Sequence, residues 1–232
     1  MQMLQKRRLF SSQVLGILKE KHNMWERRAP LSPSQVKELI RQNDTLKVLI
    51  QPCSRRIFSN QEYIAAGANI NEDLSEASTI LGVKSPDPSE LMEGKSYMFF
   101  GHITKAQPYS MPLLDTLLEK NIRLFDYEAI TKDGRDDTQR LVAFGYYAGV
   151  AGMIDGFRGL GLRLLSEGFS TPFLNVSFAN MYPTVSDARE TIAKVGKLLE
   201  TSGVGLERGI AIAFTGQGNV SQVTNTDTNI KY

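Results

Sequence analysis

Gly216 and Gly218 stand in a string whose residue types and spacing suit phosphate binding. The string Gly-Gln-Gly-Asn-Val-Ser, residues 216–221, follows the short apolar run 209–214. In a dinucleotide-binding βαβ unit, a turn of this kind joins the first strand to a helix whose N-terminus faces the pyrophosphate. Gly216 would make the tight bend, Gly218 would let the backbone approach the phosphates, and Ser221 is small enough for close helix packing. By itself the string is a weak signal.

Charged and titratable residues follow three other apolar runs, at the points where buried strands are expected to end. Lys84 follows run 78–83, His102 follows run 96–101, and Glu128 closes the string Asp-Tyr-Glu at 126–128. Ligands bind outside the carboxyl ends of the strands of an open α/β sheet. Lys84, His102 and Glu128 are therefore candidates for a binding or acid/base site rather than ordinary surface charges.

The elements that must position these residues alternate between strands and short helices. Strands are expected at 14–18, 47–51, 78–83, 96–101 and 122–126, and helices at 33–40, 61–67 and 112–119. Ser32 is the expected N-cap of the first helix, with Pro33 at its first position. This alternation predicts the α/β class with a doubly wound, mainly parallel sheet of Rossmann-like or flavodoxin-like type.

The remaining third of the chain has a different pattern. Glycines recur at helical spacing among apolar residues from Ala143 to Leu165, which favours a long helix, and a charged surface helix is expected at 187–201. We expect a substrate-binding α/β domain over 13–142, interdomain helices and linker over 143–208, and a truncated start of an NAD(P)-binding domain with a polar tail over 209–232. In that last segment a strand at 210–214 is expected to lead into the glycine-rich turn.

Composition excludes several functional classes. The chain has 232 residues, a formal net charge of +2 and 41% hydrophobic residues, so neither nucleic acid nor a membrane is an expected partner. The single Cys53 cannot form an internal disulfide, and two histidines, His22 and His102, make a histidine-rich metal site improbable. Residues 1–12 are basic and contain no acid, which fits a mitochondrial presequence; a disordered start is the alternative.

Five strings together resemble a known enzyme family: Trp25 to Pro33, Gly82 to Pro86, Phe99 to Gln107, Leu124 to Glu128 and Ala143 to Gly152. The pattern is similar to the lysine-ketoglutarate reductase portion of the α-aminoadipic semialdehyde synthases. More broadly it resembles the lysine-forming saccharopine dehydrogenases and the N-terminal domain of alanine dehydrogenases and pyridine nucleotide transhydrogenases. The resemblance runs from about Val14 to Ser221.

The resemblance implies an NADPH-dependent reductive condensation of L-lysine with 2-oxoglutarate to saccharopine, a step of lysine degradation. Saccharopine carries three carboxylates, and arginine suits bidentate carboxylate binding. By position, Arg28 matches the family's substrate-carboxylate arginine, with Arg27 as its neighbour. Lys84 and His102 match the paired acid/base residues that must take a proton from the amine and give one to the departing water.

Two further sets of residues carry implied roles. Glu128 matches a family carboxylate that tunes the lysine or binds the substrate amine. Gly216, Gly218 and Ser221 match the NADP(H)-binding turn, as a vestige, because the crossover helix and the ribose-binding acidic residue are not found after it. The chain by itself is therefore expected to be inactive.

Two other functions stay open from the sequence. One is an alanine-dehydrogenase-like amino acid dehydrogenase with the same two-domain plan. The other is a non-catalytic protein that binds carboxylate ligands, or associates with a full-length homologue through the glycine-rich helix; a homo-oligomer is also open. The expected location is the mitochondrial matrix, with the cytoplasm as the alternative.

Overall fold

The computed structural model describes residues 13–135, 139–203, 210–216, 218 and 220–221 of the chain. Residue contacts divide it into two compact units, Met1–Ala143 and Phe144–Tyr232, and each has its own hydrophobic core. The expected presequence at 1–12 lies outside the described residues, and the expected domain boundaries stay a prediction. No helix of the described residues is long and apolar enough to cross a membrane.

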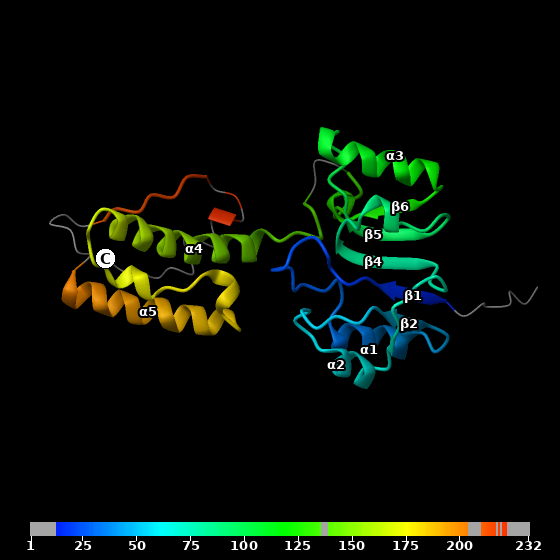
Figure 1. Ribbon diagram of the computed structural model, residues 1–232, viewed down its shortest axis with the longest axis horizontal. Helices are drawn as coiled ribbons and strands as arrows, with labels where there is room; N and C mark the ends of the chain where they lie inside the picture. Colours follow the sequence, from blue (N-terminus) through cyan, green and yellow to red (C-terminus); the bar gives the residue numbers. More distant parts are fainter. Residues whose placement is uncertain (1–12, 136–138, 204–209, 217, 219, 222–232) are drawn as a thin grey trace, which may run out of the picture. The chain divides into compact units, whose positions relative to one another are not determined.

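The first unit is built on a six-stranded sheet with the order β3-β2-β1-β4-β5-β6, in which every neighbouring pair is parallel (Figure 1). Its strands are β1 Val14–Ile17, β2 Lys47–Ile50, β3 Asn69–Ile70, β4 Thr79–Lys84, β5 Ser96–Phe100 and β6 Arg123–Asp126. Its helices are α1 Pro33–Gln42, α2 Asn60–Ala65 and α3 Met111–Glu119. This arrangement confirms the expected α/β class. The edge strand β3 was not anticipated, because two residues are too short for an alternating pattern to be visible.

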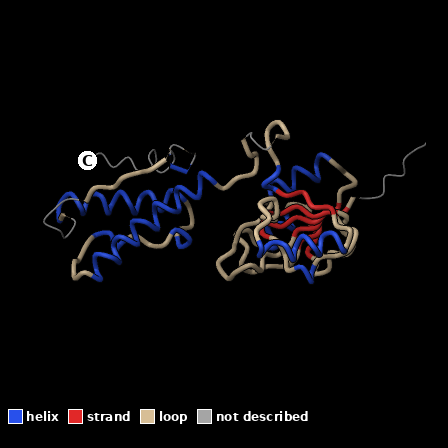
Figure 2. Tube along the Cα trace, turned by 90° about the horizontal axis from the view of Figure 1, so that it is seen from above, coloured by secondary structure: helices blue, strands red, loops and turns tan. Residues whose placement is uncertain are grey.

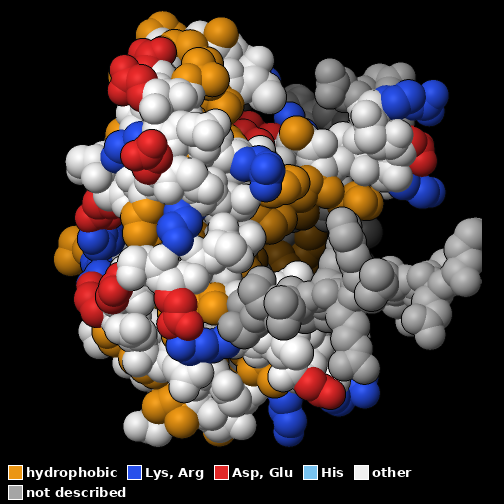
Figure 3. All heavy atoms as spheres, turned by 90° about the vertical axis from the view of Figure 1, so that its right-hand side faces the viewer, with side chains coloured by type: hydrophobic (Ala, Val, Ile, Leu, Met, Phe, Trp, Pro, Cys, Tyr) orange, Lys and Arg blue, Asp and Glu red, His pale blue; other side chains and the backbone are white. Residues whose placement is uncertain are grey.

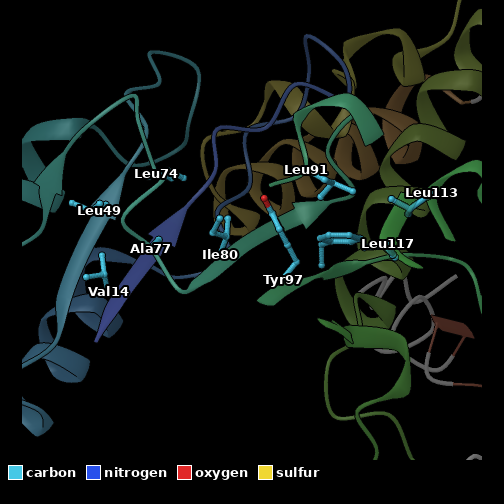
Figure 4. Close-up of a cluster of buried hydrophobic side chains, with 10 residues drawn as sticks. Val14, Leu49, Leu74, Ala77, Ile80, Leu91, Tyr97, Leu113 and Leu117 are labelled. Atoms are coloured by element: carbon cyan, nitrogen blue, oxygen red, sulfur yellow. The ribbon is translucent and has the colours of Figure 1, made fainter. Parts of the chain in front are cut away.

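Helices cover both faces of this sheet (Figure 2). Val48 and Ile50 of β2 pack in a cluster with residues of α1 and α2, whereas Leu49 between them joins the opposite cluster, which includes Tyr97 and residues of α3 (Figure 4). The alternation follows from the two-residue period of a strand. Because helices cover both faces, a ligand is expected at the ends of the strands and not on a face of the sheet.

The strand order reverses direction between β1 and β4. From β1 the chain proceeds to β2 and β3 on one side, and then crosses to β4, β5 and β6 on the other side. In an open parallel sheet, the crevice at such a switch point, outside the carboxyl ends of the strands, is the usual ligand site. A ligand site is therefore expected at the loops that follow β1 and β4.

The loop between β1 and α1 is fixed at its far end by a capping box. The Ser32 side chain accepts a hydrogen bond from the Gln35 N–H, and the Gln35 side chain accepts one from the Ser32 N–H. Pro33 occupies the first turn of α1, as expected from the sequence. Satisfying these N–H groups locks the start of α1, and with it the end of the loop that carries Arg28.

The second unit contains two helices, α4 Gly145–Ser166 and α5 Val185–Ser202, which share a core with the 3₁₀ turn η4, Pro172–Asn175 (Figure 1). Both helices were expected. The expected strand at 210–214 is wrong, because residues 210–216 form no strand. A parallel strand needs a neighbouring strand to accept its hydrogen bonds, and the described residues of this unit provide none.

Candidate active site at the carboxyl edge of the sheet

Lys84 is the last residue of β4, at the switch-point edge of the sheet. Its Cα pairs with that of Phe100, the last residue of β5, and the register of the two strands shifts between Leu81 and Lys84. The backbone of β4 is thus irregular where it reaches the edge. Lys84 is half-buried there.

The backbone of β4 at this point contacts Glu20, which lies three residues beyond the end of β1 and is only 7% exposed. Its Oε1 accepts the Val83 N–H at 2.6 Å and its Oε2 accepts the Lys84 N–H at 3.0 Å. Burial raises the pKa of Glu20 above its ordinary value, and the two N–H groups partly oppose that shift. A buried carboxylate therefore anchors the end of the strand that carries Lys84.

Arg28 is held by Glu26 from the same loop. Its Nε donates to Glu26 Oε1 at 2.8 Å and its Nη2 donates to Oε2 at 2.5 Å. The Glu26 side chain is 6% exposed, whereas that of Arg28 is 40% exposed. Hydrogen bonds from Arg28 lower the pKa of Glu26, and the charge of Lys84 adds a smaller effect in the same direction. Glu26 is thus ionised and orients a guanidinium that reaches solvent.

His102 and Glu128 meet at the ends of β5 and β6. The register pairs Phe99 with Asp126, so the residues that follow the two strands are neighbours. His102 Nδ1 lies 3.2 Å from Glu128 Oε1, and Arg140 Nη1 lies 3.6 Å from the same oxygen. This geometry makes the His102 imidazole the best-oriented candidate for proton transfer in the site.

Tyr127 lies between the His102–Glu128 pair and Glu20. It is buried, its ring contacts that of Phe100 edge-on, and Phe100 stacks on His102. Burial raises the pKa of Tyr127 to about 12, and the negative charge of Glu20 adds to the increase. Tyr127 is therefore a neutral phenol at physiological pH, placed within electrostatic reach of Glu20.

A cavity of about 770 Å³ opens beside Lys84. It is lined by Glu20, Lys84 and residues that follow β1, β3 and β4, with Leu18, Leu74, Met92 and Tyr97 among its apolar walls. Two ion pairs on the lining, Lys19–Glu72 and Lys21–Glu90, bring both signs of charge to it. The volume is sufficient for a small-molecule ligand.

Arg27 is not drawn into either group. It is exposed, and its Nε donates to the Arg55 carbonyl at 3.2 Å, which ties two loops of the same unit together. Figure 3 shows Lys and Arg interspersed with Asp and Glu on the face that it presents, so no single sign of charge dominates that face.

The glycine-rich turn lies in the second unit. Gly216 has a φ of +89°, so it makes the expected bend, and Val220 and Ser221 are helical. However, the Ser221 hydroxyl donates to the Thr215 carbonyl at 3.0 Å, a Cβ added at Gly218 would meet no atom within 4 Å, and residues 210–215 form no strand. The described residues thus form the bend expected of a phosphate loop, and the strand expected before it does not form at 210–215.

Sequence reasoning missed Glu20, Glu26 and Arg140. Glu20 follows a predicted strand, as Lys84 and His102 do, so the same strand-end argument extends to it. Glu26 and Arg140 carried no comparable signal, because their partners are set by loop geometry. The described residues contain no cluster of three or more His, Cys, Asp or Glu side chains that could hold a metal ion.

Comparison with known proteins shows similarity to amino acid dehydrogenases. The family model described as alanine dehydrogenase/PNT, N-terminal domain, matches residues 16–151. The Rattus norvegicus protein named alpha-aminoadipic semialdehyde synthase, mitochondrial, is 43% identical over 217 residues, which are 93% of this chain and 23% of that protein. This chain thus spans about a quarter of the length of that relative.

Two further matches are less similar in sequence or cover less of this chain. Saccharopine dehydrogenase (NAD(+), L-lysine-forming) from Candida glabrata is 32% identical over 133 residues, 55% of this chain and 34% of that protein. A solved structure named L-alanine dehydrogenase is 23% identical, with a TM-score of 0.48, and the match covers 67% of this chain and 42% of that one.

Proposed function

The chain belongs to the alanine dehydrogenase/PNT N-terminal domain family, whose model matches more than half of it, and on this basis we propose that its first unit binds the substrates of a lysine-ketoglutarate reductase. In this proposal the ε-amine of L-lysine condenses with the ketone of 2-oxoglutarate, and NADPH reduces the resulting imine to saccharopine. The relative from Candida glabrata is named for saccharopine, L-lysine and NAD(+). That name supports the amino acid chemistry and a nicotinamide cofactor, and the preference for NADPH is our own proposal.

The observation that carries the proposal is the placement of three groups along one edge of the sheet. Lys84, the Glu26–Arg28 pair and the His102–Glu128 pair all follow carboxyl ends of parallel strands or their loops. Condensation needs a fixed cation for a carboxylate, a base for the amine and an acid for the departing water. These residue types supply each of those needs.

We assign the steps that this chain's own side chains perform. Arg28, oriented by Glu26, binds a substrate carboxylate with its solvent-facing guanidinium. Lys84, in its neutral amine form, takes a proton from the lysine ammonium, which frees the lone pair that attacks the ketone carbon. His102, oriented by Glu128, protonates the carbinolamine oxygen, which leaves as water. A nicotinamide supplies the hydride, and the residues of the glycine-rich turn take no part in these proton transfers.

Calorimetric titration with saccharopine tests the binding part without requiring turnover. We expect binding to the wild-type chain, weakened in Arg28→Gln and unchanged in Arg41→Gln, whose arginine pairs with Glu38 on the surface of α1. Alanine, the substrate of the alternative dehydrogenase, is the matched control ligand. Tighter binding of alanine than of saccharopine would remove the proposal.

NADPH oxidation at stoichiometric protein concentration tests the reaction. With lysine and 2-oxoglutarate we expect no multiple turnover by this chain alone, because residues 210–215 do not form the strand that would carry the glycine-rich turn. If the wild-type chain does turn over, and turnover is lost in Lys84→Met or His102→Phe, the cofactor binds to this chain outside the glycine-rich turn. Pyruvate with ammonia serves as the comparison pair.

We also propose a mitochondrial location, supported by the printed name of the Rattus norvegicus relative. A fluorescent protein fused after residues 1–25 should be imported into mitochondria. A purely cytosolic signal would remove this part of the proposal.

A further inference from the structure

Glu20 occupies the place where β1 and β4 separate. The Leu18 N–H donates to the Leu81 carbonyl at 2.9 Å, which continues the pairing of β1 with β4 one residue beyond β1. At the next positions, the N–H groups of Val83 and Lys84 donate to the Glu20 carboxylate. A side chain thus extends the hydrogen bonding between the β1 and β4 segments at the switch point of the sheet.

Gly82 leaves the room that this arrangement needs. A Cβ built there would lie 3.2 Å from the Lys84 carbonyl oxygen, 3.3 Å from Leu18 Cδ1 and 3.6 Å from Glu20 Oε1. A Cβ at this position would be tight against the bend of β4 and against Leu18, and in ordinary van der Waals contact with the carboxylate. The absence of a side chain at Gly82 and the acid at position 20 therefore belong to one structural feature.

The charged and titratable groups near Glu20 come from its own loop and from two other segments. Glu26 and Arg28 act on it from the loop before α1, and its own negative charge acts on Tyr127 at the end of β6. Arg55 Nη2 donates to the Glu20 carbonyl oxygen at 3.2 Å and so fixes its backbone. Burying a carboxylate is costly unless hydrogen bonds compensate, and here both oxygens accept from the strand that carries Lys84. A glutamine could accept only one of these two bonds through its single carbonyl oxygen.

We propose that Glu20 is a positioning residue for Lys84, which holds the end of β4 so that the lysine amine stays beside the Glu26–Arg28 pair. The role of Lys84 in proton transfer rests on the proposed function, whereas the anchoring of its backbone does not. The two can therefore be tested separately.

The first test uses the wild-type chain and heteronuclear NMR at a series of pH values. The amide proton shifts of Val83 and Lys84 should titrate together, with one midpoint above the ordinary glutamate value of 4.5, because both N–H groups bond the same buried carboxylate. The transition should vanish at both amides in Glu20→Gln. Amides that titrate with separate midpoints, or not at all, would overturn the proposal. This wild-type measurement stands even if the variant fails to fold.

The second test measures the reactivity of the Lys84 amine by competitive acetylation and mass spectrometry. Glu20→Gln should change the Lys84 labelling rate severalfold while surface lysines such as Lys194 keep theirs. Glu72→Gln is the matched control, because Glu72 lines the same cavity and pairs only with Lys19 among the ion pairs of the described residues. Equal Lys84 rates in wild type and Glu20→Gln would overturn the positioning role.

The saccharopine titration separates failure of the proposed function from failure of this inference. A wild-type chain that does not bind saccharopine, but whose Val83 and Lys84 amides follow Glu20, loses the proposed function and keeps the anchoring. A chain that binds saccharopine equally well in wild type and Glu20→Gln, with unchanged Lys84 labelling, keeps the function and loses the positioning role.

Discussion

The Nδ1 atom of His102 lies 3.2 Å from Oε1 of Glu128, although the two residues are 26 positions apart in the sequence. The parallel pairing of β5 with β6 brings them together, and a 15% exposed Glu128 side chain keeps the carboxylate partly shielded from solvent. A carboxylate at Nδ1 favours the tautomer that carries the proton on that nitrogen. Nε2 then faces away from Glu128 as the atom available for proton exchange with a ligand.

Replacing Glu128 should therefore change the tautomer of His102. In wild type at neutral-to-basic pH we expect the Nδ1–H form to predominate, and in Glu128→Ala we expect the Nε2–H form, which imidazole ordinarily prefers. The nitrogen chemical shifts of the His102 ring distinguish the two forms. Glu119→Ala, an exposed glutamate on α3, should leave the shifts unchanged. The same tautomer in wild type and Glu128→Ala would contradict an orienting role.

Removal of the Arg28 guanidinium should weaken the fold in a pH-dependent way. Hydrogen bonds from Arg28 lower the pKa of Glu26, so their contribution is fully present above the ordinary value of 4.5 and is lost as pH falls through the lower, folded-state pKa. At neutral pH, Arg28→Gln should lower the free energy of unfolding by about 1–3 kcal/mol, the cost of removing two side-chain hydrogen bonds from a buried charged acceptor. The wild-type and variant stabilities should converge below pH 4.5.

Urea denaturation across a series of pH values measures this difference. Arg41→Gln is the matched control, since Arg41 pairs with Glu38 on an exposed face of α1 and such pairs contribute little. A stability difference for Arg28→Gln that is constant from neutral to acidic pH would contradict the assignment of the shift to Arg28.

The loop that carries His102 has strained backbone at both of its ends. His102 has a φ of +53° and Ala106 a φ of +48°, conformations that cost a residue with a side chain about 1–2 kcal/mol. Glycine at 106 removes the strain, although its greater freedom in the unfolded chain offsets about 0.5–1 kcal/mol. Ala106→Gly should therefore raise the free energy of unfolding slightly, by up to about 1 kcal/mol.

Ala129→Gly provides the comparison for this substitution. Ala129 is exposed and is not among the residues with a positive φ, so glycine there should lower stability. Thermal unfolding of the two variants should give shifts of opposite sign. A loss of stability in both would show that the loop does not store strain at Ala106.

The sequence predicted the parts of this fold that depend on local patterns. The five longer strands were expected within a residue or two, because each is a short apolar run bounded by polar residues. Ser32 and Pro33 marked the start of α1 correctly, since capping chemistry is local. The strand ends also located Lys84, His102 and Glu128 at one edge, because parallel strands bring all their carboxyl ends together.

What could not be predicted depends on the surroundings of each residue. An apolar run at 210–214 resembles a strand, but a strand forms only where a neighbour accepts its hydrogen bonds. Arg28 was expected to bind a substrate carboxylate, and nothing in its type shows that Glu26 already engages its Nε and Nη2. The position of Glu20 after a strand is visible in the sequence, but the two amides that its oxygens bind depend on the irregular end of β4.

The packing of α4 against η4 in the second unit should depend on Gly161. A Cβ at this position would lie 2.9 Å from the carbonyl carbon of Phe173 and 3.0 Å from the backbone nitrogen of Leu174. Backbone atoms cannot rotate away as a flexible side chain does, so Gly161→Ala should force the helix and the turn apart. We expect a net loss of about 1–3 kcal/mol in the free energy of unfolding.

Gly156→Ala in the same helix is the matched variant, because a Cβ there meets no atom within 4 Å. Alanine stabilises an open helical position by about 1 kcal/mol relative to glycine, so this substitution should raise the free energy of unfolding. Guanidinium denaturation followed by circular dichroism measures both variants. Opposite signs would show that Gly161 is required for close packing and Gly156 is not. Stabilisation by alanine at both positions would mean that η4 does not press against α4 at Gly161.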